Sequence, residues 1–566
     1  MEKRWNILKA DPALVASLQD ALKISPILCE LLVQRGIVDF EEAKRFFRPA
    51  IEHLHSPWLM KDMRKAVDRI QLAFEKQEKI LVFGDYDVDG TTSVATLYQF
   101  LKELSPSIDY YIPHRYKEGY GISKMGIDYA KEHGFKLIIS VDCGIKSTDL
   151  ITYAKELDID FVICDHHLPD PIIPPAVAIL NPKQVDCTYP FKELCGCGVV
   201  FKLITALAEV YNLPSESYLQ YLDLVVTAIA ADIVPVVDEN RTLSFFGLQK
   251  INDNPCNGLK AILEQSKQTF PIKMSSLGFT VSPRINAAGR MDDAKKAVQL
   301  FIEKDFTNAR AIASLLQQDN LDRREADSSI TEEALIQIEN DPNHQNKKSS
   351  VVFQAHWHKG VVGIVASRLI EKYYKPTIVL TQSGEVIAGS ARSVLGFNLY
   401  EALHACREHL LGYGGHFAAA GMTLSLDKLE DFKEAFEKAV AERITEEQLT
   451  PEITINSLLP LDNISMNFYQ IIAQMEPFGP ENIKPIFIAH KVYDTGYSKL
   501  VKDLHISCSF KQGNTTIRGI GYNMPQHIDI IKSGKPFDIV FQLQLNDWQG
   551  TQSVQLQIMD IKPYPI

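Results

Sequence analysis

The apolar residues in the first part of the chain gather in runs of strand length, and a stretch with helical spacing follows each run. The runs cover residues 80–83, 137–141 and 161–164, and they are continuous rather than alternating. A continuous apolar strand is buried on both faces, which is typical of a parallel sheet covered by helices. The pattern therefore predicts an α/β unit built from βαβ elements.

Helical periodicity dominates from about residue 200 to 345, and the charged stretch over 308–339 predicts a long connecting helix. A polar, turn-rich segment at 341–350 marks a domain boundary, and a second α/β unit follows. After Pro451 the chain becomes rich in strand-like segments. These segments are 485–492, 505–510, 515–522, 538–545 and 553–559. Five strands within about 110 residues favour an OB-type β-barrel, a fold that often binds single strands.

A chain of 566 residues is too long for one hydrophobic core, because single cores stop growing at about 250–300 residues. We expect an α/β protein with a parallel-sheet domain and a second α/β domain joined by a long helix, followed by the barrel. The expected parts are a helical extension at 1–75, the first α/β domain at 76–305, the connecting helix at 306–340, the second α/β domain at 341–450 and the barrel at 451–566.

Composition and charge exclude several classes of protein. A hydrophobic fraction of 46% and a charged fraction of 23% are typical of folded globular chains. The net charge of −12, from 59 basic and 71 acidic residues, argues against a protein that coats nucleic acid by bulk attraction. A metal-dependent nuclease stays compatible with this charge, because it concentrates carboxylates at its centre and needs only a local basic channel.

Neither the start of the chain nor its most apolar internal stretch, 224–237, predicts export or a membrane span; Asp232 interrupts that stretch. The nine cysteines show no paired CxxC spacing, which favours the reducing cytoplasm. Cys187, Cys195 and Cys197 lie close in sequence but lack the spacing of a zinc site, so we expect them to be packed in the core.

Acidic and imidazole side chains follow the predicted strands. Asp85, Asp87 and Asp89 recur at every second position after the first strand, which would place them on one side of an extended chain. Asp142 follows the second strand, and His166 and His167 follow the third; these lie at the carboxyl ends of strands, where open α/β sheets carry their sites. A further carboxylate, Asp232, closes the apolar stretch at 224–231.

Each of these residues also has an ordinary interpretation, as a solvated turn, a helix cap or a surface histidine pair. Their joint occurrence at successive strand ends favours a metal site, because so many carboxylates repel one another unless cations neutralise them. Carboxylate and imidazole together suit Mn²⁺ or Mg²⁺. Two such ions, roughly 3.5–4 Å apart, are able to activate a water and stabilise the leaving oxygen of a phosphodiester.

Four segments, at 84–93, 140–145, 165–167 and 230–235, resemble the four motifs of the DHH phosphoesterase superfamily in order and spacing. The resemblance implies that the catalytic metal ligands are Asp87, Asp89, Asp142, His166 and Asp232. It also implies that Asp85 is an additional ligand or a group that supports the ligands. His167 would be a ligand or a phosphate contact.

Five further segments, at 112–121, 283–290, 360–368, 390–392 and 414–421, are similar to motifs of the RecJ exonucleases, and the last two are typical of the DHHA1 domain. Arginines beside glycines allow guanidinium and backbone N–H groups to approach phosphate oxygens closely. The expected substrate-binding residues are Arg115, Arg284, Asn286, Arg290, Ser367, Arg368, Ser390, Arg392 and His416. Structural roles stay open for them: glycine-alanine runs also permit close helix packing, and Arg368 is within reach of Glu371 on a helix.

The RecJ resemblance implies a 5′-to-3′ exonuclease of single-stranded DNA that uses Mn²⁺ or Mg²⁺ and acts in DNA repair and recombination. It also implies a monomer, with a single-strand-binding protein and a helicase as partners. Two alternatives remain at this stage. A DHH phosphodiesterase of short oligonucleotides or cyclic dinucleotides would not need the barrel, and a non-catalytic RecJ-like factor would lack metal ligands.

Overall fold

The computed structural model describes residues 2–291, 293–548 and 550–565, with the side chain of Trp548 outside the described part. Its chain contacts divide it into two compact units. The larger unit consists of Trp5–Ser282, Ala297–Arg310 and Thr454–Ile566, and the smaller unit of Met1–Arg4, Pro283–Lys296 and Ala311–Ile453. No helix in the described ranges is long and apolar enough to cross a membrane.

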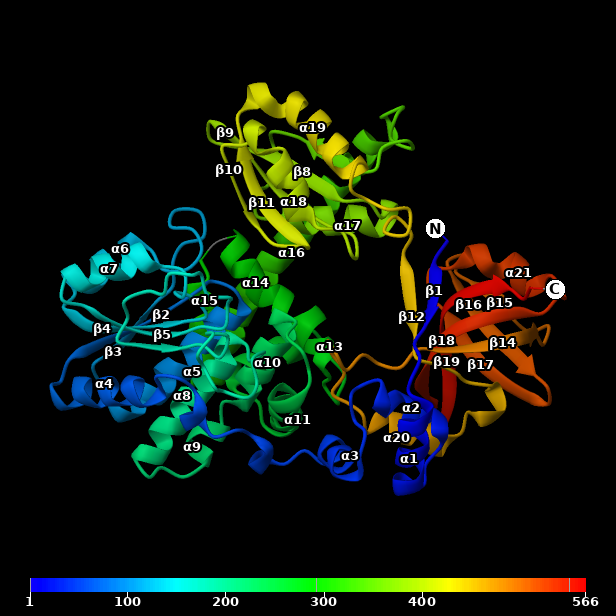
Figure 1. Cartoon of the computed structure of the whole chain (residues 1–566), viewed down its shortest axis with the longest axis horizontal. Coiled ribbons are helices and arrows are strands. Elements are labelled where there is room, and N and C mark those ends of the chain that lie inside the picture. Colours follow the sequence, from blue (N-terminus) through cyan, green and yellow to red (C-terminus); the bar gives the residue numbers. More distant parts are fainter. Residues whose placement is uncertain (1, 292, 549, 566) are drawn as a thin grey trace. The chain divides into compact units, whose positions relative to one another are not determined.

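A five-stranded parallel sheet in the order β3-β2-β4-β5-β6 forms the centre of the larger unit (Figure 1). Its strands are β2 (Lys79–Gly84), β3 (Ile108–Tyr111), β4 (Phe135–Val141), β5 (Asp160–Cys164) and β6 (Ala178–Leu180). The three long strands confirm the predicted apolar runs. The short edge strands β3 and β6 were not predicted, because few residues leave little periodic signal. Since β3 lies at the edge, the three predicted strands remain neighbours in the sheet.

Helices connect and cover the strands of this sheet. They are α4 (Met63–Glu75), α5 (Val88–Leu104), α6 (Lys124–Glu132), α7 (Thr148–Glu156), α8 (Gly196–Val210) and α9 (Glu216–Leu219). The chain continues through α10 (Leu222–Asp232), α11 (Asp238–Asp253), α12 (Asn257–Gln265), α13 (Met274–Ser276), η3 (Leu277–Val281), α14 (Ser282–Met291) and α15 (Lys295–Ile302). Most residues of α10 are buried. Gly247 of α11 allows the two helices to pack closely, since a Cβ at that position would lie 2.5 Å from the Leu222 carbonyl oxygen of α10. This packing fixes Asp232 at the end of α10.

The C-terminal strands form a closed sheet in the order β13-β14-β18-β19-β17-β16-β15, and an additional pairing of β14 with β16 completes the ring. The strands are β13 (Ser457–Leu458), β14 (Phe487–Asp494), β15 (Lys499–Val501), β16 (His505–Gln512), β17 (Thr515–Gly521), β18 (Phe537–Trp548) and β19 (Thr551–Pro563). Two helices accompany them, α20 (Met466–Ala473) and α21 (Ile528–Lys532). The closed ring confirms the predicted OB-type barrel.

The first helices of the chain pack on this barrel. They are α1 (Pro12–Leu22), α2 (Pro26–Val33) and α3 (Phe40–Phe47), which follow β1 (Arg4–Ile7). Leu18 and Leu31 belong to the same buried cluster as Phe487, Phe510 and Phe537 of the barrel. The side chain of Gln34 donates to the Asn456 carbonyl oxygen, a contact across 422 positions of sequence. The extension is therefore part of the barrel's core.

The smaller unit contains most of the long helix α16 (Phe306–Glu339), which confirms the predicted connecting helix. Its sheet has the order β10-β11-β9-β8-β7, in which only β7 and β8 run parallel. The remaining elements are β7 (Ser350–Phe353), α17 (Val362–Tyr373), β8 (Thr377–Ser383), β9 (Val386–Arg392), α18 (Leu399–Ala405), β10 (Gly412–Gly415), β11 (Ala419–Leu424), α19 (Leu429–Ala441) and β12 (Glu452–Ile455). Phe432 and Phe436 of α19 fill its core against the sheet. A second α/β fold is thereby confirmed.

Candidate metal centre

The three aspartates after β2 are not on one extended strand, so that part of the prediction was wrong. After β2 ends at Gly84, the chain bends at Tyr86 and Asp87 and enters α5 at Val88. Asp87 is the N-cap of α5, since its Oδ1 accepts from the Gly90 N–H at 2.9 Å, and Asp89 lies in the first helical turn. A strand-to-helix turn replaces the extended segment because the N-cap bond satisfies an otherwise unpaired N–H of the helix.

Two backbone N–H groups at the start of α8 hold the carboxylate of Asp89. Its Oδ2 accepts from the Gly196 N–H at 2.6 Å and its Oδ1 accepts from the Cys197 N–H at 2.7 Å. The amino end of a helix favours a carboxylate, because its N–H groups are unpaired and its dipole is positive there. Sequence reasoning had assigned Cys197 only to packing and missed this role of the two backbone N–H groups; the glycine pair around Cys197 was the available signal.

Asp165 organises the loop after β5, and sequence reasoning did not select it as a site residue. Its Oδ1 accepts from the His166 N–H at 2.7 Å and faces Nδ1 of His167 at 2.7 Å, while its Oδ2 accepts from the Ile145 N–H at 2.9 Å. Burial raises the pKa of Asp165, but the hydrogen bond and charge of His167, together with the bond from the Ile145 N–H, outweigh burial and lower the pKa to about 2. Asp165 therefore stays ionised and fixes the ring of His167, whose Nε2 lies 3.2 Å from the Tyr120 hydroxyl.

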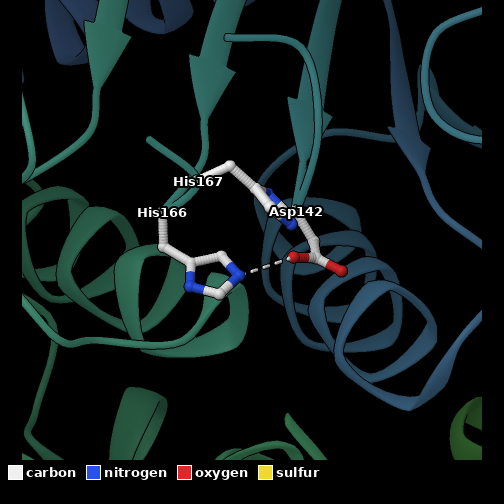
Figure 2. Close-up of side chains that lie close together, drawn as sticks. All are labelled: Asp142, His166 and His167. Atoms are coloured by element: carbon white, nitrogen blue, oxygen red, sulfur yellow. Dashed lines mark ion pairs between the residues drawn. The ribbon is translucent and has the colours of Figure 1, made fainter. Parts of the chain in front are cut away.

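The imidazole of His166 faces three carboxylates from three different elements. Its Nε2 lies 3.2 Å from Asp142 Oδ1, 3.6 Å from Asp232 Oδ2 and 3.7 Å from Asp89 Oδ2. Figure 2 shows Asp142, at the end of β4, pointing toward His166, with His167 beside them. Two groups of side chains have ligand atoms within 4.8 Å of one another: Asp142, His166 and His167, and Asp89, His166 and Asp232.

Burial and mutual repulsion dominate the electrostatics of this cluster. Burial, followed by the charge of Asp87, raises the pKa of Asp89 to about 7. Burial, followed by the charge of Asp89, raises the pKa of Asp232 to about 8 and that of Asp142 well above its usual range. Burial lowers the pKa of His166 to about 3, so the ring is neutral and cannot balance the carboxylates.

These residues fit a divalent metal centre. Carboxylate oxygens and a neutral imidazole are ligands that suit Mn²⁺ and Mg²⁺, and bound cations would remove the repulsion that burial imposes. Asp85 is fully buried, and its Oδ1 accepts from the Gly121 N–H at 3.2 Å. Neither Asp85 nor Asp87 belongs to the two close ligand groups, and Asp85 Oδ2 is buried without a hydrogen-bond partner among the described residues. Arg115 lies over the ring of Tyr86, with its guanidinium carbon 4.8 Å from the ring centre.

Several predicted phosphate-binding residues come together in the smaller unit. Arg392 Nη1 donates to Ser390 Oγ at 2.9 Å on β9. A Cβ on Gly363 would lie 3.0 Å from both Arg392 Nη2 and Ser390 Oγ, so the start of α17 lies against this pair. Arg290 of α14 donates to the Gly360 carbonyl oxygen at 2.9 Å. Three sequence motifs therefore meet around β9.

Two other arginines have partners that the sequence did not indicate. Arg368 pairs with the buried carboxylate of Asp327 at 2.6 Å and not with Glu371, because α16 presents Asp327 to α17. Arg284 Nε donates to Gln317 Oε1 at 2.7 Å. Both arginines are therefore anchored on α16. Such contacts orient a guanidinium group while part of it stays exposed: the Arg368 side chain is 45% exposed.

The remaining predicted residues of the smaller unit are less closely connected. Ser367 Oγ donates to the Gly363 carbonyl oxygen at 3.3 Å, and Asn286 is half-buried on α14. His416 lies in the turn between β10 and β11, with its Nδ1 3.3 Å from the Ala419 carbonyl oxygen. Sequence reasoning missed Arg323 and Arg324, whose charges, after burial, lower the pKa of Arg284.

The fold and the carboxylate-histidine centre define a phosphoesterase of the DHH class. Residues 79–229 match the DHH family N-terminal domain, residues 346–442 match the DHHA1 domain and residues 455–560 match the RecJ OB domain. All three matches follow the order predicted from the sequence.

Known proteins define the family more closely. RecJ of Bacillus subtilis, a single-stranded-DNA-specific exonuclease, is 37% identical over 98% of this chain and 70% of its own length. RecJ of Escherichia coli is 31% identical over 96% of both chains. The crystal structure of Thermus thermophilus RecJ in complex with Mn²⁺ superposes with a TM-score of 0.85 at 27% identity, covering 100% of this chain and 80% of that chain. The chain belongs to the RecJ family of single-stranded-DNA-specific exonucleases.

Gly196→Ala tests the close packing at the metal centre. A Cβ at position 196 would lie 2.7 Å from the Asp142 Cβ, so Asp142 or the start of α8 must move. We expect Mn²⁺ affinity, measured by calorimetry, to fall at least tenfold, and the unfolding temperature of the metal-free protein to fall further than in Gly198→Ala. In that control variant the added Cβ would lie no closer than 3.3 Å to its nearest neighbour, Leu194 Cδ2. Equal Mn²⁺ affinity in the two variants would contradict the assigned role of Gly196.

Proposed function

We propose that the chain is a metal-dependent exonuclease that hydrolyses single-stranded DNA in the 5′-to-3′ direction, in DNA repair and recombination. The observation that carries the proposal is the contact of His166 Nε2 with three carboxylates, Asp142, Asp232 and Asp89, at 3.2–3.7 Å. Similarity to RecJ proteins over nearly the full length of the chain supports the choice of substrate.

The proposed ligands of two Mn²⁺ or Mg²⁺ ions are Asp87, Asp89, Asp142, His166 and Asp232, with Asp85 as a supporting group. Two such ions, when bound, lower the pKa of a water and stabilise the leaving oxygen of a phosphodiester. His167 is proposed to contact the phosphate or a metal through Nε2, because Asp165 occupies its Nδ1. The Tyr120 hydroxyl lies 3.2 Å from that Nε2, and it would have to release Nε2 when the phosphate or metal binds.

The proposed phosphate anchors are the basic and hydroxyl groups of the RecJ-like motifs. Arg392 and Ser390 form a preorganised pair, so binding a terminal phosphate requires little side-chain ordering. The other proposed contacts are Arg115, Arg284, Asn286, Arg290, Ser367, Arg368 and His416.

The closed barrel favours this proposal over a phosphodiesterase for short oligonucleotides or cyclic dinucleotides, because such an enzyme would not need a strand-binding domain. A non-catalytic RecJ-like factor is disfavoured because the ligand set is intact. We further propose a cytoplasmic monomer with domain boundaries near 75, 305, 340 and 450, and a single-strand-binding protein and a helicase as partners.

Asp142→Ala should abolish hydrolysis while binding of single strands survives, since the strand is held mainly by other residues. Loss of a metal ligand removes several kcal/mol of transition-state stabilisation, which corresponds to about 10³-fold or more in rate. The assay is nucleotide release from a long single strand with Mn²⁺, beside the exposed control Asp68→Ala. Turnover within tenfold of wild type would remove Asp142 from the centre. Excess chelator should silence the wild type, and Mn²⁺ or Mg²⁺ should restore it.

Polarity is tested with two oligonucleotides, one blocked by a bulky group at its 5′ end and one at its 3′ end. We expect the 5′ block alone to protect, because the terminal-phosphate anchor selects the end that reaches the metals. Arg392→Ala should lose the preference for a 5′-phosphate, whereas Arg407→Ala, an exposed arginine of the same unit, should keep it. Protection by the 3′ block alone would overturn the polarity, and an unchanged phosphate preference would exclude Arg392.

The barrel's role in strand capture is best tested with point variants, since deletion at Pro451 would expose the core that α1 and α2 share with it. Tyr522 is 49% exposed and is our candidate stacking platform; Trp548, the other candidate, has its side chain outside the described part. Tyr522→Ala should weaken binding of a long single strand by about fivefold or more, because stacking contributes about 1–3 kcal/mol per base. Tyr522→Phe keeps the ring and should bind normally. Equal binding by both variants would rule out stacking on Tyr522.

A further inference from the structure

A cavity in the larger unit shares no residue with the metal centre. Its volume is about 430 Å³, and three segments line it: residues 35–55 of the N-terminal helices, residues 237–242 at the start of α11, and residues 481–482 before the barrel strand β14. Three arginines and two histidines contribute to the lining: Arg35, Arg45, Arg241, His53 and His55.

Arg241 is a fixed positive charge in the wall of this cavity. It is 5% exposed, and its guanidinium carbon lies 3.8 Å from the ring centre of Phe46. Its N–H groups donate to backbone carbonyl oxygens, among them those of Phe46 at 2.9 Å, Met475 at 2.9 Å and Glu476 at 3.2 Å. These bonds satisfy the donors of Arg241 but leave its charge without a carboxylate.

Arg35 retains donors that are not used within the protein. Its Nε donates to Asn482 at 2.9 Å, its Nη1 to the Leu31 carbonyl oxygen at 2.7 Å and its Nη2 to the Ile483 carbonyl oxygen at 2.7 Å. Each Nη carries a second hydrogen beyond these bonds. Throughout the described ranges, Arg35 and Arg241 form no ion pair with a carboxylate. Burial lowers the pKa of Arg35 to about 10.

Two further donors face the same space. Arg45 is exposed and makes no hydrogen bond or ion pair with any residue that the structure describes. His53 Nδ1 accepts from the Ala50 N–H at 3.1 Å, so the neutral ring carries its hydrogen on Nε2 as a donor. The cavity thus combines several unused N–H donors with the positive charges of the buried Arg241 and the half-buried Arg35.

Three acidic residues also line the cavity, and none of them forms an ion pair with Arg35, Arg45 or Arg241 in the ranges that the structure describes. Glu42 accepts from the Val38 N–H at 2.8 Å, Asp238 lies 3.3 Å from His55 Nε2, and Glu481 forms no ion pair within the described part of the chain. Burial, followed by the charge of Arg35, lowers the pKa of Arg241 to about 9, which is the mark of two cations that repel each other. Burying the guanidinium groups of Arg241 and Arg35 without a paired carboxylate is costly, and an anion would relieve the cost.

We propose that this cavity binds a phosphate-bearing ligand, a nucleoside monophosphate by its size, with the phosphate on Arg35, Arg45 and His53. The apolar residues of the lining, Ile37, Phe46, Pro49 and Val237, suit a base and sugar. The ligand would touch the N-terminal helices, α11 and the segment before β14 at once. Because it binds only when these segments are assembled, it stabilises the folded state of the larger unit.

The test is a calorimetric titration of the full chain with deoxyadenosine monophosphate, inorganic phosphate and deoxyadenosine, all in excess chelator so that the metal centre does not contribute. We expect saturable binding of the monophosphate, weaker binding of phosphate and no binding of deoxyadenosine. The double variant Arg45→Ala/His53→Ala should weaken monophosphate binding by about tenfold or more, since it removes hydrogen bonds to the charged phosphate.

Three variants separate this cavity from other phosphate-binding groups. Arg48→Ala removes an exposed arginine of the same segment that does not line the cavity, and it should bind normally. Asp142→Ala and Arg392→Ala alter the metal centre and the proposed substrate anchor, and both should keep the component of monophosphate binding that Arg45→Ala/His53→Ala loses. The proposal is overturned if the wild type does not bind the monophosphate, if deoxyadenosine binds equally well, or if binding is lost in Arg392→Ala and kept in Arg45→Ala/His53→Ala.

Discussion

Repulsion among buried carboxylates at the carboxyl edge of the parallel sheet is the constraint on which the larger unit depends. Asp89 and Asp142 are each 2% exposed, and both lie near Asp232 and the neutral ring of His166. Concentrating negative charge in this way is unfavourable unless cations share the site. The energetic cost of the apo protein and its affinity for divalent ions are therefore two aspects of one arrangement.

The surrounding fold holds the carboxylates in place without neutralising them completely. Backbone N–H groups at the start of α8 hold both oxygens of Asp89, and Asp165 is held by the loops around it. The buried side chain of Asn240 donates to the carbonyl oxygens of Glu193 at 2.6 Å and Pro235 at 2.9 Å, which ties the loop before α8 to the turn after Asp232. Neutral donors of this kind fix geometry and leave the charge available for metals.

Much of this arrangement was predictable from the sequence. Continuous apolar runs predicted the central strands, and the residues after them, Asp142 and His166, meet as expected for strand ends of a parallel sheet. The strand-like segments after Pro451 predicted the barrel.

Other features depend on contacts that no local pattern reveals. The alternation of Asp85, Asp87 and Asp89 suggested an extended segment, but the N-cap bond of Asp87 turns the chain into a helix. Arg368 of α17 forms an ion pair with Asp327 of α16. The N-terminal helices share a core with the barrel, and one hydrogen bond between them, from Gln34 to Asn456, joins residues 422 positions apart in the sequence. Such pairings are decided by tertiary packing and therefore could not be predicted from spacing.

The central claim is that the buried carboxylates and His166 at the edge of the parallel sheet bind two divalent ions. A calorimetric titration of Mn²⁺ into the chelator-treated, metal-free chain tests this claim directly. The account predicts saturable binding of two ions per chain, accompanied by a rise in the unfolding temperature, because the ions bind only the folded state. An absence of saturable binding, or an unfolding temperature that does not respond to Mn²⁺, would contradict it.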